Sequence, residues 1–202
     1  MTTKRAATCH HEAGHAVTSF ALGVKFMHIV VWDESDGEVL PECGRCTSCM
    51  HYFEKNNPAN DSHAKRIQDD IRREIAVAVA GEIAEVLYSH TATTINADEV
   101  EADRYRARQC ACFLHMWSKS SDCAGRPWTD ACAISDPFLT KMRTAVERLL
   151  RDPKTWCAVT ALATHLENGT HPRTSWEEAI DVIVKSGLLF ESIPAASLPP
   201  AP

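Results

Sequence analysis

The chain has 202 residues, of which 45% are hydrophobic and 24% charged, so a wholly disordered or collagen-like chain is excluded. Its 21 basic and 27 acidic residues give a net charge of −6, which argues against nucleic acid as a main partner because phosphate binding needs a basic surface. Ten histidines and nine cysteines are the unusual feature, because both residue types bind metals.

The N-terminal part of the sequence predicts a helix followed by a small sheet. Apolar residues three to four positions apart predict a helix over 2–22, which Gly23 ends. The β-branched and aromatic run 26–32 predicts a strand, and 38–40 is a candidate for its partner strand. A polar, cysteine-containing loop is expected over 41–62.

Apolar periodicity and capping residues predict five further helices. They cover residues 63–88, 97–117, 136–150, 154–167 and 175–185. The predicted fold class is therefore mainly α (α+β), with a small β-sheet after the first helix. We expect a single domain over 1–190 and a Pro-rich, unstructured tail over 191–202.

Neither an apolar signal-peptide core nor an apolar run of about 18 residues occurs in the sequence, so no membrane association is expected. The number of cysteines is odd, and a chain of this length can bury a core without disulfides. Reduced thiols and a cytoplasmic location are therefore expected.

The strongest chemical signal is the HExxH pattern formed by His11, Glu12 and His15 in the first predicted helix. Residues four apart lie on one face of a helix, so both imidazoles can bind one zinc ion. Glu12 follows the first histidine and can take a proton from a water molecule held by the metal. It is therefore the expected general base.

A catalytic zinc requires a third protein ligand, and the residues alone leave several acids as candidates. Asp98 lies in the first turn of a predicted helix, where the helix dipole stabilises an acid even without a metal. Glu82 and Glu85 lie in an apolar run, where an unpaired charge is costly. We expect hydrogen-bonded roles for both glutamates, and for Glu85 a contact that supports a metal ligand.

Several segments resemble, in the same order, the peptidase domain of the FtsH-type ATP-dependent zinc metalloproteases. These segments are HEAGHAVTSFALG at 11–23, VKFMHIVV at 24–31, AGEIAE at 80–85, DEVEADRYRAR at 98–108 and the stretch 161–183. The resemblance implies a helical, zincin-like peptidase domain. It also implies that His11, His15 and Asp98 bind one zinc ion and that Glu12 is the general base.

The sequence departs from this family at several points. Ala97 precedes Asp98 where the family usually has Asn, and Glu82 replaces an Arg. The GxxxxGK phosphate loop of the family's ATPase does not occur in the sequence. We therefore expect cleavage of unfolded or flexible protein substrates without an attached ATPase, with a homo-oligomer or a separate unfoldase as a further partner.

A second candidate metal site is the loop sequence Cys43-x2-Cys46-x2-Cys49, with His51 close by. Three cysteines and one histidine form a known structural zinc set, and CxxCxxC also begins some iron–sulfur patterns. A metal-free loop with thiols or a disulfide remains the alternative.

The predicted function is a zinc-dependent metalloendopeptidase whose peptide substrate lies along the edge of the sheet near 26–32. Two alternatives remain open. The first is a catalytically idle, metal-binding regulator or adaptor with a peptidase-like fold, and the second is a redox or iron–sulfur module built on the cysteine loop.

Overall fold

The structure, a computed structural model, describes residues 4–31, 61–90, 97–118, 128–169, 173–190, 193 and 197–200. This part of the chain is mainly helical with a small two-stranded sheet, which confirms the predicted fold class. The strands are β1 (His28–Val30) and β2 (Arg173–Ser175). The helices are α1 (Lys4–Leu22), α3 (Asp61–Ser89), α4 (Ala97–Ser118), α5 (Trp128–Leu150), α6 (Pro153–Asn168) and α7 (Trp176–Lys185).

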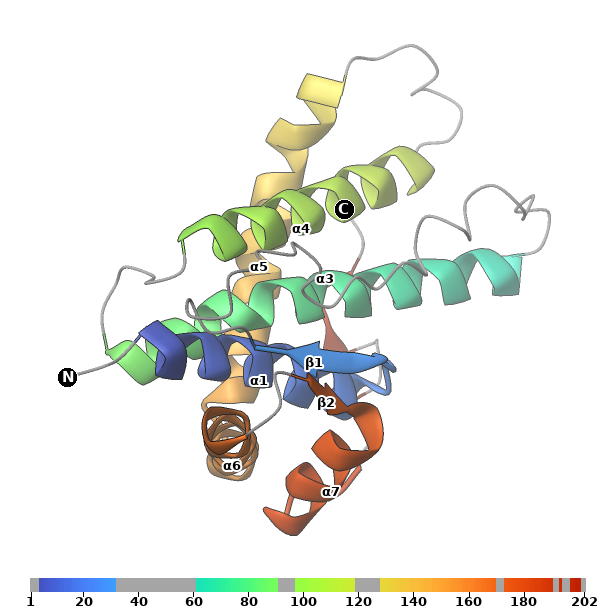
Figure 1. Cartoon of the computed structure of the whole chain (residues 1–202). Helices are drawn as coiled ribbons and strands as arrows, with labels where there is room; N and C mark the ends of the chain where they lie inside the picture. The colour runs from blue at the N-terminus through green and yellow to red at the C-terminus, as the bar shows by residue number, and fades with distance from the viewer. Residues whose placement is uncertain are drawn as a thin grey trace.

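Three helices, α1, α3 and α4, lie side by side and form the layer that carries the candidate site (Figure 1). Helix α3 is the central member, since it packs against α1 on one side and against α4 on the other. Helix α5 crosses α3 and α4, while α6 covers α1 and α7 packs on α6. Among the described residues, no helix combines the length and the hydropathy of a membrane span.

The close approach of α1 to α3 depends on Gly14. A Cβ atom at this position would lie 2.5 Å from Cβ of Ala84 and 2.8 Å from the backbone oxygen of Ala80. Both distances are shorter than van der Waals contact, so a side chain at Gly14 would push the two helices apart. The glycine of the HExxH helix therefore sets the distance at which the histidines face α3.

Capping residues are found at the ends of several helices. Gly23 has φ 69°, the left-handed conformation that ends α1. At the start of α6, Asp152 accepts hydrogen bonds from the backbone N–H groups of Lys154 and Thr155. At the start of α7, Ser175 and Glu178 form a capping box.

The sheet forms between strands that are far apart in the sequence. β1 pairs antiparallel with β2, with His28 opposite Ser175 and Val30 opposite Arg173. The candidate partner strand at 38–40 lies outside the described residues. β2 was not predicted, because three polar residues carry no strand pattern of their own and their extended conformation comes from pairing with β1.

Part of the C-terminal tail packs against the helices. Leu198 is buried, and the guanidinium of Arg72 on α3 donates hydrogen bonds to the backbone oxygens of Leu198 and Pro199. The backbone N–H of Ile193 donates to the oxygen of Ala21 at 3.0 Å. The expectation of an unstructured tail is therefore wrong for these residues, because one buried leucine and one buried arginine anchor them.

We expect Gly14→Val to lower the free energy of unfolding by about 3 kcal/mol, because the added atoms overlap the backbone of α3. Urea denaturation followed by circular dichroism measures the change. Gly169→Ala is the matched control, since Gly169 is exposed with φ −64° and any residue adopts that conformation. Equal stability of the Gly14→Val variant and the control would contradict the close α1–α3 contact.

Candidate metal centre

Helix α1 carries all three residues of the HExxH pattern into the interior. His11 is 1% exposed and Glu12 is 7% exposed, while the His15 side chain is half-buried. Burial of polar side chains is costly unless they find partners, so three such residues on one apolar helix indicate a site.

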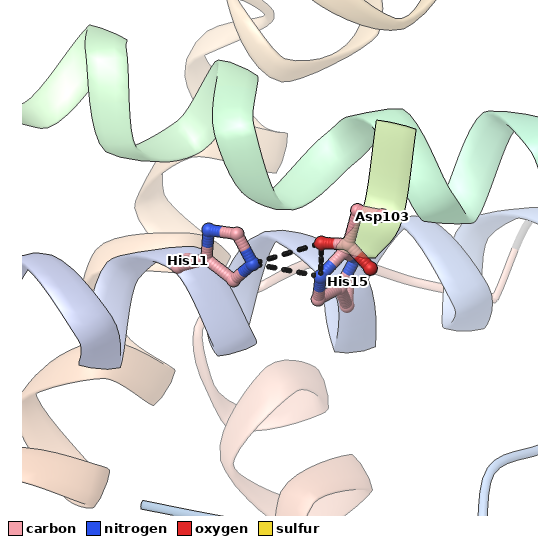
Figure 2. Close-up of side chains that lie close together, drawn as sticks. All are labelled: His11, His15 and Asp103. Atoms are coloured by element: carbon pink, nitrogen blue, oxygen red, sulfur yellow. Dashed lines mark hydrogen bonds and ion pairs between the residues drawn. The ribbon is translucent and has the colours of Figure 1, made fainter. Parts of the chain in front are cut away.

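The partner of both histidines is Asp103 on α4 (Figure 2). Its Oδ2 atom lies 3.0 Å from Nε2 of His11 and 2.9 Å from Nε2 of His15. The two Nε2 atoms are 3.1 Å apart. Two imidazoles and one carboxylate from two different helices therefore meet at a single point.

The groups that face Nδ1 of each ring determine what the Nε2 atoms can do. Nδ1 of His15 lies 2.7 Å from the backbone oxygen of Val77, which can only accept, so Nδ1 carries the proton. Nδ1 of His11 faces a carboxylate oxygen of Glu85 at 3.4 Å, which favours a proton there as well. Each neutral ring then presents the lone pair of Nε2 toward Asp103.

Three electron-rich atoms at these separations repel one another unless protons or a cation lie among them. Ligand atoms on a tetrahedral zinc ion are about 3.3 Å apart, so the observed spacing needs to widen by only about 0.3 Å. The contacts of His15 with Val77 and of His11 with Glu85 are of the kind that orients histidine ligands of a metal. The three side chains could therefore hold a metal ion.

Gly81 on α3 forms the floor of this centre. A Cβ atom at this position would lie 2.5 Å from Nε2 of His15 and 2.6 Å from Nε2 of His11. Any side chain here would occupy the space onto which both nitrogens converge. The absence of a side chain at Gly81 is therefore a second feature that fits a bound ion.

The two glutamates expected to support the site have different surroundings. Glu85 is fully buried and lies beside His11, as described above. Glu82 instead accepts hydrogen bonds from Arg104 at 2.5 and 3.1 Å and forms an ion pair with Arg143. Glu82 thus links α3 to α4 and α5, and it affects the centre through the position of α4.

Glu12 and Glu99 are two further carboxylates at this centre. One carboxylate oxygen of Glu12, one carboxylate oxygen of Glu99 and one ring nitrogen of His11 all lie within 4.8 Å of one another. Glu99 belongs to α4 and lies one helical turn before Asp103, so both acids project from the same face. Glu99 was not among the candidate site residues predicted from the sequence.

The surroundings shift the pKa values of the clustered groups. Burial lowers the pKa of His11, but the contacts with Asp103 and Glu85 outweigh it and raise this pKa to about 10. Burial also lowers the pKa of His15, but the charge of Asp103, the hydrogen bond with Asp103 and the charge of Glu12 together outweigh it and raise this pKa. Burial raises the pKa of Glu12, and it also raises the pKa of Glu99 together with the charge of Glu12.

The prediction of Asp98 as the third ligand is corrected by the structure, which places Asp103 against the two imidazoles. Asp98 is exposed in the first turn of α4. Asp98 and Asp103 are five residues apart, which corresponds to about 140° around a helix and about 7.5 Å along its axis. The two side chains therefore cannot face the same point.

A signal for Asp103 was present in the periodicity of α4. Val100, Ala107, Ala111 and Leu114 are buried and define the face that packs against the other helices. Their spacing of three or four residues includes position 103 and excludes position 98. For Gly81 no signal existed in its own helix, because its role depends on the two histidines of α1.

The other candidate ligands either lie outside the described residues or pack elsewhere. Cys43, Cys46, Cys49 and His51 lie outside the described residues, so the second metal site stays a prediction. His10 is next to the motif, but its ring stacks on the ring of Tyr88, with the two ring centroids 3.7 Å apart. Its Nδ1 atom lies 2.8 Å from the backbone oxygen of Ala6. It packs in the core and contributes no ligand.

No protein-family model matches the sequence, and no curated protein matches it either. What the centre does is therefore inferred from its residues and their geometry.

Asp103→Asn is expected to weaken zinc binding by at least about 100-fold, since the anionic ligand becomes a neutral amide. Asp98→Asn is the matched control on the same helix and is expected to leave the affinity unchanged. Competition with a fluorescent chelator measures both dissociation constants. A larger loss in the Asp98 variant would restore Asp98 as the ligand.

The metal-free protein is expected to lose stability as the pH rises from 6.5 toward 10. The folded pKa of His11 lies above its unfolded value, so the stabilising protonated form is present below about pH 6.5 and is lost toward pH 10. We expect Tm to decrease by at least about 3 °C. In a domain of this size, that decrease corresponds to a loss of about 1 kcal/mol in the free energy of unfolding.

Thermal unfolding in a chelator at pH 6.5 and 9.5 tests this pH dependence. With saturating zinc the decrease should vanish, because metal binding uses the neutral imidazoles. A metal-free Tm that is constant or rises between these pH values would contradict the protonated His11–Asp103 pair.

Proposed function

We propose that the protein is a zinc-dependent metalloendopeptidase that hydrolyses peptide bonds of unfolded or flexible proteins. The observation that carries this proposal is the convergence of His11, His15 and Asp103 beside the buried carboxylate of Glu12. Two imidazoles and one acid form a typical ligand set of a catalytic zinc, which leaves a fourth position open. The resemblance to the FtsH-type proteases supports the same chemistry.

His11, His15 and Asp103 would hold the zinc ion, which would lower the pKa of a bound water and polarise the scissile carbonyl. Glu12 accepts a proton from the attacking water as its oxygen bonds to the carbonyl carbon. Glu12 then donates that proton to the amine nitrogen as the C–N bond breaks. The raised pKa of Glu12, caused by burial, makes its carboxylate a stronger base.

The backbone oxygen of Val77 and several side chains around the ligands keep the imidazoles in the orientation that this reaction needs. Val77 fixes the ring of His15, and Glu85 lies against the ring of His11. The paired guanidiniums of Arg104 and Arg143 hold α4 through Glu82, and α4 carries Asp103. These contacts come from three helices and position the ligands before any substrate binds.

A peptide substrate is proposed to bind along the small sheet as an added strand, since β1 and β2 form a two-stranded sheet. Flexible chains are the proposed substrates because such binding requires an extended backbone. A homo-oligomer or a separate unfoldase remains part of this proposal, as does a cytoplasmic location suggested by the odd number of cysteines.

We expect Glu12→Gln to reduce peptide hydrolysis by roughly 10²- to 10⁴-fold, because the amide cannot accept the proton. Purified wild type and variant are compared on casein and unfolded peptides, with products identified by mass spectrometry. Zinc content is measured in both proteins and is expected to stay the same, since Glu12 is not among the three proposed zinc ligands.

Two outcomes would contradict the peptidase proposal. Equal hydrolysis by both proteins would indicate a contaminating protease. Absence of hydrolysis by zinc-loaded wild type over a broad substrate panel would favour the alternative, a metal-binding regulator or adaptor that has no turnover.

A further inference from the structure

The segment that follows α7 contacts both α1 and α3, and the proposed peptidase mechanism assigns it no role. We call its described residues, 188–190, 193 and 197–200, the C-terminal strap. On α1, the backbone oxygen of Ala21 accepts a hydrogen bond from the N–H of Ile193 at 3.0 Å. The ring of Phe190 packs on the ring of Phe20, with the two ring centroids 5.3 Å apart. The strap is therefore attached to the end of the HExxH helix.

The second attachment is made by Arg72 of α3, whose side chain is 9% exposed. Its Nε atom donates to the backbone oxygen of Pro199 at 2.7 Å, and its Nη2 atom donates to the backbone oxygen of Leu198. Asp69 holds the remaining nitrogen of the guanidinium at 2.9 Å. The Leu198 side chain is 7% exposed and belongs to the hydrophobic core. Because a buried guanidinium must replace its lost hydration, these contacts bind the strap specifically to α3.

Both attachments lie close to the proposed zinc centre. Nδ1 of His15 on α1 lies 2.7 Å from the backbone oxygen of Val77 on α3. From this contact, Ala21 lies about 9 Å further along α1 and Arg72 lies about 7.5 Å back along α3, at a rise of about 1.5 Å per residue. The strap thus joins the two helices less than two turns from a proposed zinc ligand.

The contact between α1 and α3 is made by small residues, which explains why a further attachment matters. Gly14 of α1 packs on Ala80 and Ala84 of α3. Small side chains form shallow ridges, so they fix the distance between two helices better than the position of one helix along the other. A slide of α1 would move both imidazoles relative to Asp103, although the ligands of a metal must be held within about 0.5 Å.

We infer that the C-terminal strap fixes the position of α1 along α3 and thereby controls the affinity of the centre for zinc. Arg72 and Leu198 are the positioning residues of this device. The inference rests on the proposed zinc centre and adds its regulation, because release of the strap separates the ligands and lowers the affinity. Coupling between two sites is reciprocal, so zinc binding tightens the strap by the same factor.

The zinc affinity of strap variants tests one direction of this coupling. Every protein in the test is the full chain with serine in place of Cys43, Cys46 and Cys49, so that the cysteine loop contributes no ligand. Competition with a fluorescent chelator is expected to show a zinc Kd at least about fivefold higher in Arg72→Gln and in Leu198→Ala. Circular dichroism at the same temperature confirms that each variant is folded, so a loss of stability alone leaves this Kd unchanged.

Arg73→Gln is the matched control on the same helix. Arg73 pairs with Asp70 three residues earlier, as Arg72 pairs with Asp69. Within the described part of the chain, its side-chain hydrogen bond goes to Asp70 and not to the strap. The zinc Kd of this variant is expected to equal that of the parent protein.

Hydrogen exchange tests the opposite direction and does not depend on whether a variant folds. The amide of Ile193 in the parent protein is measured by NMR in the metal-stripped and the zinc-loaded form. Zinc is expected to slow its exchange at least about fivefold, because the bound ion holds α1 in the position to which the strap attaches.

The outcomes separate the strap from the zinc centre. An unchanged zinc Kd in the folded strap variants, or an Ile193 amide that exchanges equally fast with and without zinc, would overturn the role of the strap and leave the centre intact. An equal loss of affinity in Arg73→Gln would also overturn it. A parent protein that binds no zinc would overturn the proposed zinc centre, and this inference with it.

Discussion

The electrostatic repulsion among three atoms is the constraint on which this structure depends. Nε2 of His11, Nε2 of His15 and Oδ2 of Asp103 all lie within 3.1 Å of one another. Such an arrangement is stable only when positive charge lies among the three atoms. Protons supply this charge in the metal-free protein, and a metal ion supplies it in the metal-bound protein. The raised pKa of both histidines and the proposed zinc binding are two consequences of the same geometry.

The packing of three helices produces that geometry. Gly14 lets α1 approach α3, and Gly81 leaves room on α3 for both imidazoles. The pairs Glu82–Arg104 and Glu74–Arg106 hold α4 against α3, so that Asp103 reaches the histidines. Surface ion pairs usually contribute little to stability, but these two have buried carboxylates and set the position of a ligand.

The helices and the first two histidines could be predicted from the sequence, because periodicity, capping residues and the HExxH spacing are all local signals. Asp103 was missed in favour of Asp98, although the buried residues of α4 favoured position 103. β2 and Gly81 could not be predicted, because the strand exists only through pairing with β1 and the glycine matters only beside the histidines of another helix. The roles of Glu82 and Glu99 likewise depend on contacts between helices.

Anomalous diffraction at the zinc absorption edge, from crystals of the zinc-loaded protein, tests whether His11, His15 and Asp103 bind one zinc ion. A peak is expected about 2.0–2.2 Å from Nε2 of His11, Nε2 of His15 and an oxygen of Asp103. A zinc-loaded crystal with no peak at these three atoms, or with its peak at Asp98, would contradict it.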